Sequence, residues 1–154
     1  MFLWYAKCFV DKLRHARKEK IVFYFAYASN MSRKQMAERC PEAKAKVVAN
    51  LPNFKLIFTG YSRLRKGAVA TIRGSQGDKV IGAVYEISEA GLRKLDKHEN
   101  HPVDYKHLEV RVFSDGGETY DAVTFIKAKQ EEEGQPSPEY RAVIQQGYRD
   151  WGII

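Results

Sequence analysis

The sequence lacks the features that define several large classes of proteins. Its 154 residues contain no run of eighteen apolar residues, which is about the length that a membrane-spanning helix needs, so no integral membrane segment is expected. The chain also lacks the GxGxxG and P-loop patterns that bind nucleotide phosphates. The GxSxG elbow of serine hydrolases is missing as well. The sequence therefore does not indicate a nucleotide-dependent enzyme or a serine hydrolase.

Cysteine and histidine are scarce. The two cysteines, Cys8 and Cys40, form no metal-binding pair, and we expect free thiols in a reducing, cytoplasmic compartment. The four histidines show no zinc-ligand spacing. His98 and His101 are three residues apart at the end of a predicted helix, with no third ligand nearby in the sequence, and we expect them at the surface. Neither a metal nor a cofactor is expected.

Positive charge is concentrated at one end of the chain. The net charge is +7, and residues 1–20 supply +4 of it from six Lys or Arg and two Asp or Glu residues. Residues 21–154 are therefore only weakly basic, so no nucleic-acid partner is expected. The first ten residues are apolar but lack the positive start and cleavage site of a signal peptide. We interpret residues 1–20 as an extension, either an additional helix or loosely ordered segment, or an arm that contacts a partner or a membrane surface.

Residues 21–154 have the length and pattern of one domain. Strands are predicted from apolar alternation over 21–27, 54–59, 67–73, 80–87, 105–113 and 119–127. Helices are predicted from Ser32 onwards, over 88–99 and over 138–150. Turns at 75–78 and 115–117 would join strands in pairs, and residues 131–138 are predicted to be a polar linker. This order predicts an α+β fold whose largely antiparallel, mixed sheet could close into a small barrel with flanking helices.

The stretch VFYFAYASNM, residues 22–31, ends a strand in small and polar residues. Alternation places Phe23, Phe25 and Tyr27 on one strand face. The turn Ala28-Ser29-Asn30 is followed at once by the helix that Ser32 caps. Such a turn can direct several backbone N–H groups at a carboxylate or an oxyanion. The alternative is an ordinary strand–turn–helix connection in which Ser and Asn only cap the helix.

Glu99 lies at the end of the helix predicted over 88–99. At 100° per residue it falls on the same face as Leu92 and Leu95, which is the inward face. Burial would raise the pKa of this carboxyl group, which suits a group that must both accept and donate a proton. The alternative is a helix that frays before Glu99 and leaves it exposed.

Several segments, in this order, resemble the γ-glutamylcyclotransferase (AIG2-like) family. The stretch YFAYASNM is similar to the family's YFAYGSNM signature, and LDKHE at 95–99 is similar to its LDxxE segment. The remaining matches are KGAVATI at 66–72, SQGD at 75–78, IGAVY at 81–85, Tyr105, Glu109-Val110 and PSPEY at 136–140. The resemblance covers about residues 21–152.

The resemblance implies a small αβ barrel with a pocket at one end for a γ-glutamyl group. Glu99 takes the position of the family's catalytic acid and base. The substrate-binding residues that the resemblance implies are Tyr24, Phe25, Ala26, Tyr27, Ala28, Ser29, Asn30, Tyr105, Phe125 and Tyr140. No cofactor is implied, the partner is a small γ-glutamyl molecule, and a homodimer stays open.

The implied reaction is intramolecular. The substrate's α-amine attacks its own γ-carbonyl carbon, which yields 5-oxoproline and a free amine. Two positions depart from the family: Ala28 replaces a glycine, and Phe125 replaces a tyrosine. The sequence therefore leaves two functions open, an active cyclotransferase or a protein of the same fold that binds γ-glutamyl or other small carboxylate ligands with little catalysis. It also leaves the leaving group open among amino acids, polyamine-like amines, lysine side chains and other metabolites.

Overall fold

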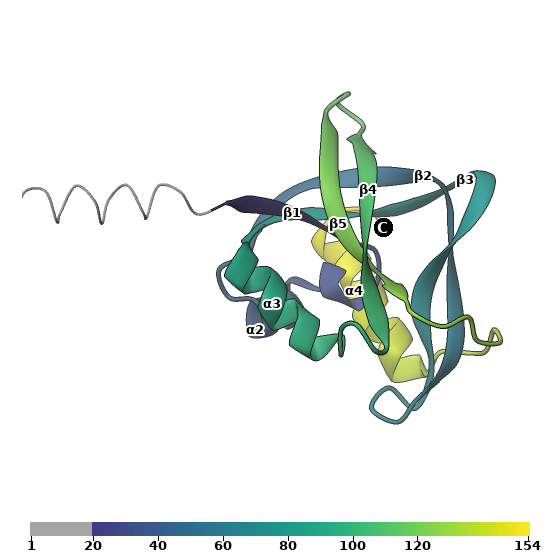
Figure 1. Ribbon diagram of the computed structural model, residues 1–154. Helices are drawn as coiled ribbons and strands as arrows, with labels where there is room; N and C mark the ends of the chain where they lie inside the picture. Colours follow the sequence, from purple (N-terminus) through teal and green to yellow (C-terminus); the bar gives the residue numbers. More distant parts are fainter. Residues whose placement is uncertain (1–19) are drawn as a thin grey trace, which may run out of the picture.

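The computed structural model describes residues 20–154 (Figure 1), so the predicted extension, residues 1–20, lies outside the described residues except for Lys20. The described strands are β1 (Ile21–Ala26), β2 (Lys44–Ser62), β3 (Gly67–Ser88), β4 (Tyr105–Ser114) and β5 (Thr119–Lys127). The helices are η1 (Ser29–Met31), α2 (Arg33–Arg39), α3 (Glu89–His98) and α4 (Pro138–Asp150). In this part of the chain no helix has the length and apolar character needed to cross a membrane.

The strands form a closed barrel in the order β1-β3-β2-β4-β5. All neighbours are antiparallel except β1 and β5, which pair in parallel where Tyr24 lies opposite Val123. The predicted mixed, largely antiparallel barrel is therefore confirmed. The helices lie together on one side of the barrel, with α2, α3 and α4 around the end of β1 (Figure 1).

Two strands are longer than predicted. β2 begins at Lys44, whereas the sequence indicated a strand only from residue 54, because Pro52 and Asn53 look like strand breakers. The predicted strands 67–73 and 80–87 are parts of one strand, β3. The predicted turn at 75–78 is wrong as a strand connection. It is a bulge opposite Asn53, where the pairing jumps from Pro52–Lys79 to Phe54–Gly74.

The backbone conformation and one side-chain hydrogen bond of Asn53 and Gly77 stabilise the bulge. Asn53 and Gly77 both adopt positive φ, at 64° and 87°, and the Asn53 side chain accepts a hydrogen bond from the Gly77 amide at 3.1 Å. Asn and Gly are the residues that tolerate this conformation best. The hairpin predicted at 115–117 is confirmed, since β4 and β5 pair from Tyr105–Lys127 to Phe113–Thr119.

Serine side chains cap the helices as predicted. The hydroxyl oxygens of Ser32 and Ser88 accept hydrogen bonds from the amides of Gln35 and Gly91, respectively. The capping box at Ser32 is only half formed, because the Gln35 side chain donates to Ser29 and Asn30 in the preceding turn instead. Helix α2 is therefore tied directly to that turn.

The two faces of β1 serve two apolar clusters, as the alternation predicted. Phe25 and Tyr27 belong to the cluster that includes residues of β2, β3, β4, β5 and α4. Tyr24 and Ala26 belong to a second cluster with Met36 of α2, Leu95 of α3 and residues of β3 and β5. Helices α2 and α3 thus pack on one face of β1, and this packing places their ends beside the turn that follows the strand.

The polar segment 131–138 is hydrogen-bonded to the backbone of β2 and β3. The amides of Gly60 and Ala68 donate to the carbonyls of Glu132 and Gln135, both at 3.0 Å, and the Gly134 amide donates to the Phe58 carbonyl at 3.0 Å. Unpaired backbone groups at strand edges need such partners. The interpretation as a linker is therefore corrected: the segment is hydrogen-bonded along β2 and β3 on its way to α4.

Candidate active site

The turn after β1 holds its backbone carbonyls away from a cavity. Those of Asn30 and Met31 accept hydrogen bonds from the Tyr85 hydroxyl at 3.0 Å and the Trp151 indole at 2.9 Å. The carbonyls of Ala28 and Ser29 are bonded within the turn. Within residues 20–154, the amides of Ala28, Ser29 and Asn30 donate to no protein group. The turn therefore presents unused N–H donors, as its sequence predicted.

Helix α4 presses this turn into place. A Cβ atom on Gly147 would lie 2.6 Å from Met31 Cβ and 2.8 Å from the Ser32 amide nitrogen, so only glycine allows the helix to approach so closely. Arg33 and Asp150 add a hydrogen bond of 3.0 Å across the same contact. The conformation of the turn is thus set by packing from outside the cavity.

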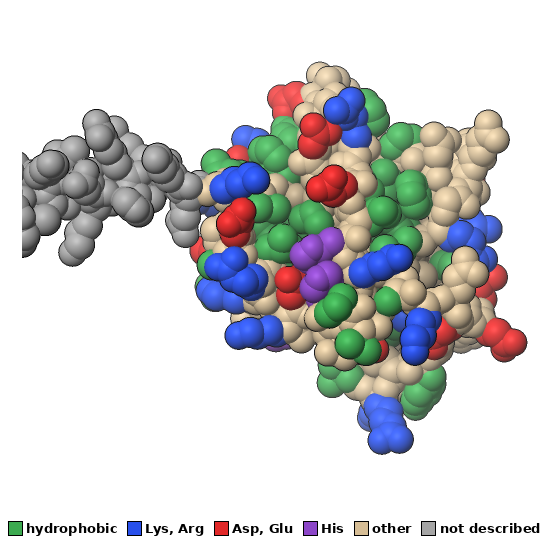
Figure 2. Space-filling view, in the orientation of Figure 1, with side chains coloured by type: hydrophobic (Ala, Val, Ile, Leu, Met, Phe, Trp, Pro, Cys, Tyr) green, Lys and Arg blue, Asp and Glu red, His purple; other side chains and the backbone are tan. Residues whose placement is uncertain are grey.

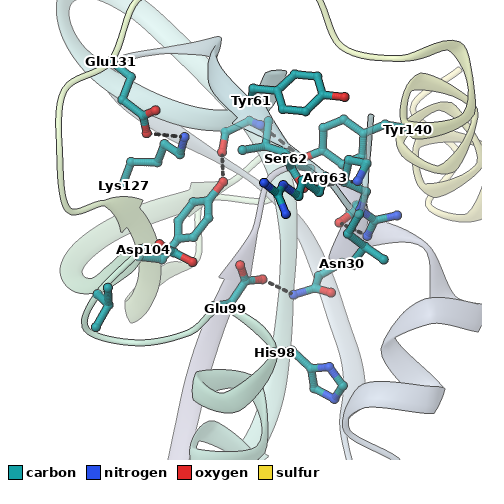
Figure 3. Close-up of a pocket in the computed structure, with 18 of the residues that line it drawn as sticks. Asn30, Tyr61, Ser62, Arg63, His98, Glu99, Asp104, Lys127, Glu131 and Tyr140 are labelled. Atoms are coloured by element: carbon teal, nitrogen blue, oxygen red, sulfur yellow. Dashed lines mark hydrogen bonds and ion pairs between the residues drawn. The ribbon is translucent and has the colours of Figure 1, made fainter. Parts of the chain in front are cut away.

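A cavity of about 510 Å³ lies over the turn (Figure 3). Tyr27, Ala28, Ser29 and Asn30 line it on one side. Glu99 lines it from the end of α3, and its carboxylate points toward the Asn30 side chain (Figure 3). The turn that ends the stretch 22–31 and the glutamate at the end of α3, which the sequence indicated separately, therefore meet in one cavity.

Glu99 is held at the end of an intact helix. Its amide donates to the Leu95 carbonyl at 2.9 Å, and its side chain is only 18% exposed. The predicted inward position is confirmed, and the helix does not fray before it. Burial raises the pKa of the Glu99 carboxyl above its usual range, while Arg39, Arg65 and the Asn30 amide partly oppose the shift.

The contacts of Glu99 are long. Its Oε1 atom lies 3.5 Å from Arg39 Nη1 and 3.4 Å from Asn30 Nδ2. Both distances exceed those of strong charge-assisted hydrogen bonds. The carboxylate therefore keeps acceptor capacity for a ligand in the cavity.

The sequence did not indicate Gln35, Arg39 or Arg65. Gln35 Nε2 donates to Ser29 Oγ at 2.8 Å, and Arg65 donates to Gln35 Oε1 at 2.8 Å. Arg65 also stacks over the Tyr140 ring at 5.0 Å, and Arg39 lines the cavity. The i, i+4 spacing of Gln35 and Arg39 on α2 was a usable signal, because it places both on one helix face. The position of Arg65 on a loop gave none.

Tyr105 and Tyr140 both line the cavity, and both bind the backbone of Ala70. The Tyr105 hydroxyl donates to the Ala70 carbonyl at 2.7 Å, and the Tyr140 hydroxyl accepts from the Ala70 amide at 3.1 Å. Burial raises the pKa of Tyr140. These two predicted site residues thus fix the wall of the cavity through β3.

Four of the predicted substrate-binding residues do not line the cavity: Tyr24, Phe25, Ala26 and Phe125. Strand alternation places Tyr24 and Ala26 in the cluster on one face of β1. Phe25 lies on the other face, where it is fully buried in the core. Tyr24 supports the site from behind, since its hydroxyl accepts from Asn30 Nδ2 at 2.9 Å. The Phe125 ring packs against Tyr24 instead of facing the cavity.

Ala28 lines the cavity with φ at −136°. The turn therefore does not need the positive φ for which glycine would be favoured. The methyl group of Ala28 adds bulk to the wall of the cavity.

The outer part of the cavity is cationic with an apolar rim. Its cationic side chains include Arg63, Lys127 and Lys129, and Lys127 pairs with Glu131 at 2.7 Å. Tyr61 and Leu64 lie at this end and are largely exposed, at 70% and 81%. This part of the cavity can accept the portion of a ligand that extends beyond the turn.

The structure also corrects the interpretation of the histidines. His101 does have neighbouring ligand groups: His107 from β4 and Asp96 from α3 lie beside it, with one candidate ligand atom from each within 4.8 Å of the others. The third member comes from a separate strand, so spacing along the chain could not reveal it. His98, in contrast, is exposed at the edge of the main cavity.

The fold and the cavity define a small closed barrel in which a buried carboxylate faces a turn of unused backbone amides. The model of the family described as gamma-glutamyl cyclotransferase, AIG2-like, matches residues 24–148. The chain belongs to this family.

Relatives of known name support the assignment. The chain is 32% identical over 140 residues to human gamma-glutamylcyclotransferase, covering 88% of this chain and 74% of that protein. It is 34% identical over 135 residues to gamma-glutamylcyclotransferase of Bos taurus, covering 84% and 71%. A solved structure named gamma-glutamyl cyclotransferase has a TM-score of 0.83 at 31% identity, covering 87% of this chain and 82% of that one.

Proposed function

We propose that the protein is a cofactor-independent γ-glutamylcyclotransferase that converts a γ-glutamyl amine or amino acid to 5-oxoproline and the free amine. The observation that carries the proposal is the placement of Glu99 opposite the unused amides of Ala28, Ser29 and Asn30 in one cavity. An acid–base group and a set of oxyanion donors are what this cyclisation needs from a protein.

The reaction needs no protein nucleophile. The α-amine nitrogen forms a bond to the γ-carbonyl carbon, and the bond from that carbon to the leaving nitrogen breaks. Glu99 first removes a proton from the α-ammonium and then delivers it to the departing amine, and the second proton that the attacking nitrogen loses passes to solvent or to the freed amine. Its raised pKa supports both steps, because a carboxyl group with a higher pKa is a stronger base toward the ammonium and still a competent acid toward the departing amine.

The turn supplies the second component. Its amides are free to donate to negative charge on the substrate, both its carboxylate and the oxyanion that develops on the γ-carbonyl oxygen. Because the turn is held by Tyr85, Trp151 and α4, its donors need not reorganise during the reaction. Arg39 and Arg65 attract the anionic end of the substrate to the same region.

Other features of the proposal remain predictions. They are a domain of residues 21–154 that carries the activity without residues 1–20, a cytoplasmic location and no nucleic-acid partner, while a homodimer stays open. The buried free thiol of Cys40 supports a reducing compartment.

A panel of γ-glutamyl compounds tests the function. Native protein should release 5-oxoproline, measured by liquid chromatography, from at least one γ-glutamyl amino acid or γ-glutamyl amine, without added metal and in the presence of a chelator. A protein that binds a member of the panel in calorimetry but releases no 5-oxoproline from any member would instead be a binding protein of the same fold.

A further inference from the structure

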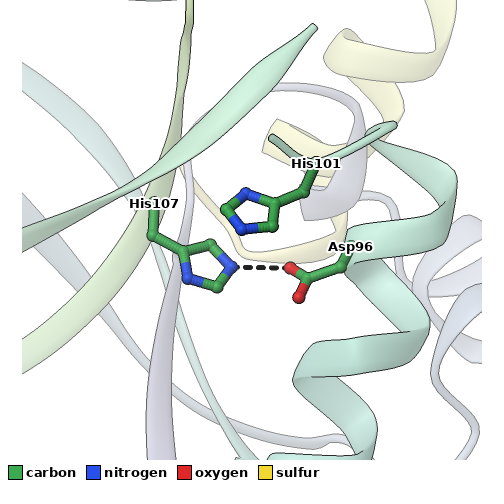
Figure 4. A group of neighbouring side chains, drawn as sticks. All are labelled: Asp96, His101 and His107. Atoms are coloured by element: carbon green, nitrogen blue, oxygen red, sulfur yellow. Dashed lines mark hydrogen bonds and ion pairs between the residues drawn. The ribbon is translucent and has the colours of Figure 1, made fainter. Parts of the chain in front are cut away.

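Asp96, His101 and His107 converge from three parts of the chain. Asp96 lies in the last turn of α3, His101 in the loop that follows, and His107 near the start of β4 (Figure 4). Asp96 Oδ1 lies 2.6 Å from His107 Nε2, and both lie within 4.8 Å of a ring nitrogen of His101. None of the three residues lines the active-site cavity.

The two imidazole rings are stacked. Their centroids lie 4.0 Å apart with an angle of 11° between the planes, and the edge of the Phe125 ring packs against His107 at 5.3 Å. The stack thus holds two imidazole rings side by side, and imidazole nitrogens are common ligands of divalent metal ions.

His101 carries a second sign of an incomplete site. Its Nδ1 atom is buried and has no hydrogen-bond partner in the part of the chain that the structure describes. A buried ring nitrogen without a partner is a polar atom whose bonding capacity is not satisfied. His101 is therefore the member of the cluster with the most unused bonding capacity.

We propose that Asp96, His101 and His107 form a binding site for one zinc-type divalent cation, separate from the active-site cavity. Two imidazoles and one carboxylate are a common donor set for Zn²⁺, and a water molecule would complete four ligands. Bonds of about 2.0–2.1 Å in a tetrahedron place ligand atoms roughly 3.3 Å apart. Small side-chain rotations reach this value from the present distances, with the stacked rings tilting so that their nitrogen edges meet at the ion.

The ion takes the place of a proton. His107 and Asp96 hold one proton between them at 2.6 Å, and Zn²⁺ bonds to the nitrogen lone pair and the carboxylate oxygen once that proton has left to solvent. Access is open, because all three side chains are only partly buried. Figure 2 shows histidine and acidic side chains next to each other on the surface of this face of the molecule.

Such an ion would fasten the end of α3 to β4. Asp96 precedes Glu99 by three residues and His101 follows it by two. The bound cation would therefore restrain the segment that carries Glu99 from both sides of that residue, while remaining outside the cavity.

Calorimetry with ZnCl₂ on the untagged, chelator-treated full chain tests the site. We expect one equivalent to bind, and the melting temperature to rise in Zn²⁺ as a consequence. His107→Gln should weaken binding at least roughly tenfold, and the double variant His101→Asn/His107→Gln should abolish it. His98→Asn, which removes a neighbouring histidine outside the cluster, should leave the stoichiometry and the affinity unchanged.

A measurement on native protein covers the case in which the variants fail to fold. Co²⁺ should give visible absorption bands of a tetrahedral site with nitrogen and oxygen donors, and Zn²⁺ should displace them. Undiminished Zn²⁺ binding by a folded double variant would overturn the proposal. So would a Co²⁺ spectrum dominated by thiolate charge transfer, or one with no tetrahedral bands.

Discussion

Asp96 and Glu99 lie three residues apart at the end of α3, yet their surroundings differ sharply. Asp96 meets His107 at 2.6 Å, a close hydrogen bond on the outer side of the helix. Glu99 faces the cavity, where its nearest cation, Arg39, lies 3.5 Å away. One carboxylate is tied to a partner, whereas the other has only loose contacts, although the two side chains are similarly exposed, at 20% and 18%. The comparison teaches that the carboxylate proposed as the proton carrier is the one that the fold leaves incompletely bonded.

Replacing Glu99 should have the largest effect. Glu99→Gln preserves the volume and much of the hydrogen bonding but cannot exchange a proton, so the rate of 5-oxoproline release should fall about 10²–10⁴-fold. Substrate binding should survive, because the backbone turn and the arginines remain. Rates and calorimetric affinities should be compared with those of Glu89→Gln, an exposed carboxylate in the first turn of the same helix.

The same variant should not lose stability. Burial raises the pKa of Glu99, so ionising it disfavours the folded state relative to the unfolded one. Relative to native protein, Glu99→Gln should therefore gain stability as the pH rises above the ordinary glutamate range, and this gain should be absent in acid. Near-native 5-oxoproline release by this variant would exclude Glu99 as the proton carrier.

Arg39→Met would increase the difference between Asp96 and Glu99, because it removes the cation nearest to Glu99. Arg39 opposes the pKa rise of Glu99, so without it the carboxyl should ionise only at higher pH. The acid side of the kcat/KM profile should accordingly move to higher pH. Arg111→Met, which breaks the exposed pair with Asp121, should leave the profile unmoved. An unchanged profile in Arg39→Met would mean that Glu99 does not set the acid limb.

Ala28→Gly should have the smallest effect, because it alters the turn opposite Glu99 without touching the carboxylate. The methyl group lines the cavity, and the φ of Ala28 is negative. KM for bulky substrates should change more than kcat for small ones, since a wall methyl affects mainly ground-state fit. A large gain in kcat at constant KM would show instead that the native turn holds its amides out of position. Ala37→Gly on the exposed side of α2 controls for general effects of added glycine.

Local patterns predicted much of the fold. The serine caps at Ser32 and Ser88, the hairpin at 115–117 and the two faces of β1 all depend on neighbours close in sequence, and all were confirmed. The first half of β2 was missed, because Pro52 and Asn53 look like an end, whereas the pairing with β3 continues past them through a bulge. The pairing of β2 with β3 along most of its length outweighed the low strand propensity of these two residues.

The candidate site was predictable in part for a related reason. Glu99 and the turn at 28–30 carried signals in their own segments, namely a leucine stripe and an abrupt strand end. Arg65 and the cluster at Asp96 carried none, since their partners come from other elements. Those contacts exist only after the barrel closes.

The hydrogen bond from the Trp151 indole to the Met31 carbonyl has a consequence for the order in which the parts of the chain fold. The two residues are 120 positions apart, so the Met31 carbonyl finds this partner only after nearly all of the barrel has been made. During synthesis, the turn that lines the cavity must wait for α4 and the residues beyond it before its shape is set. A nascent chain that stops short of α4 can thus have its strands in place while it still lacks a working site.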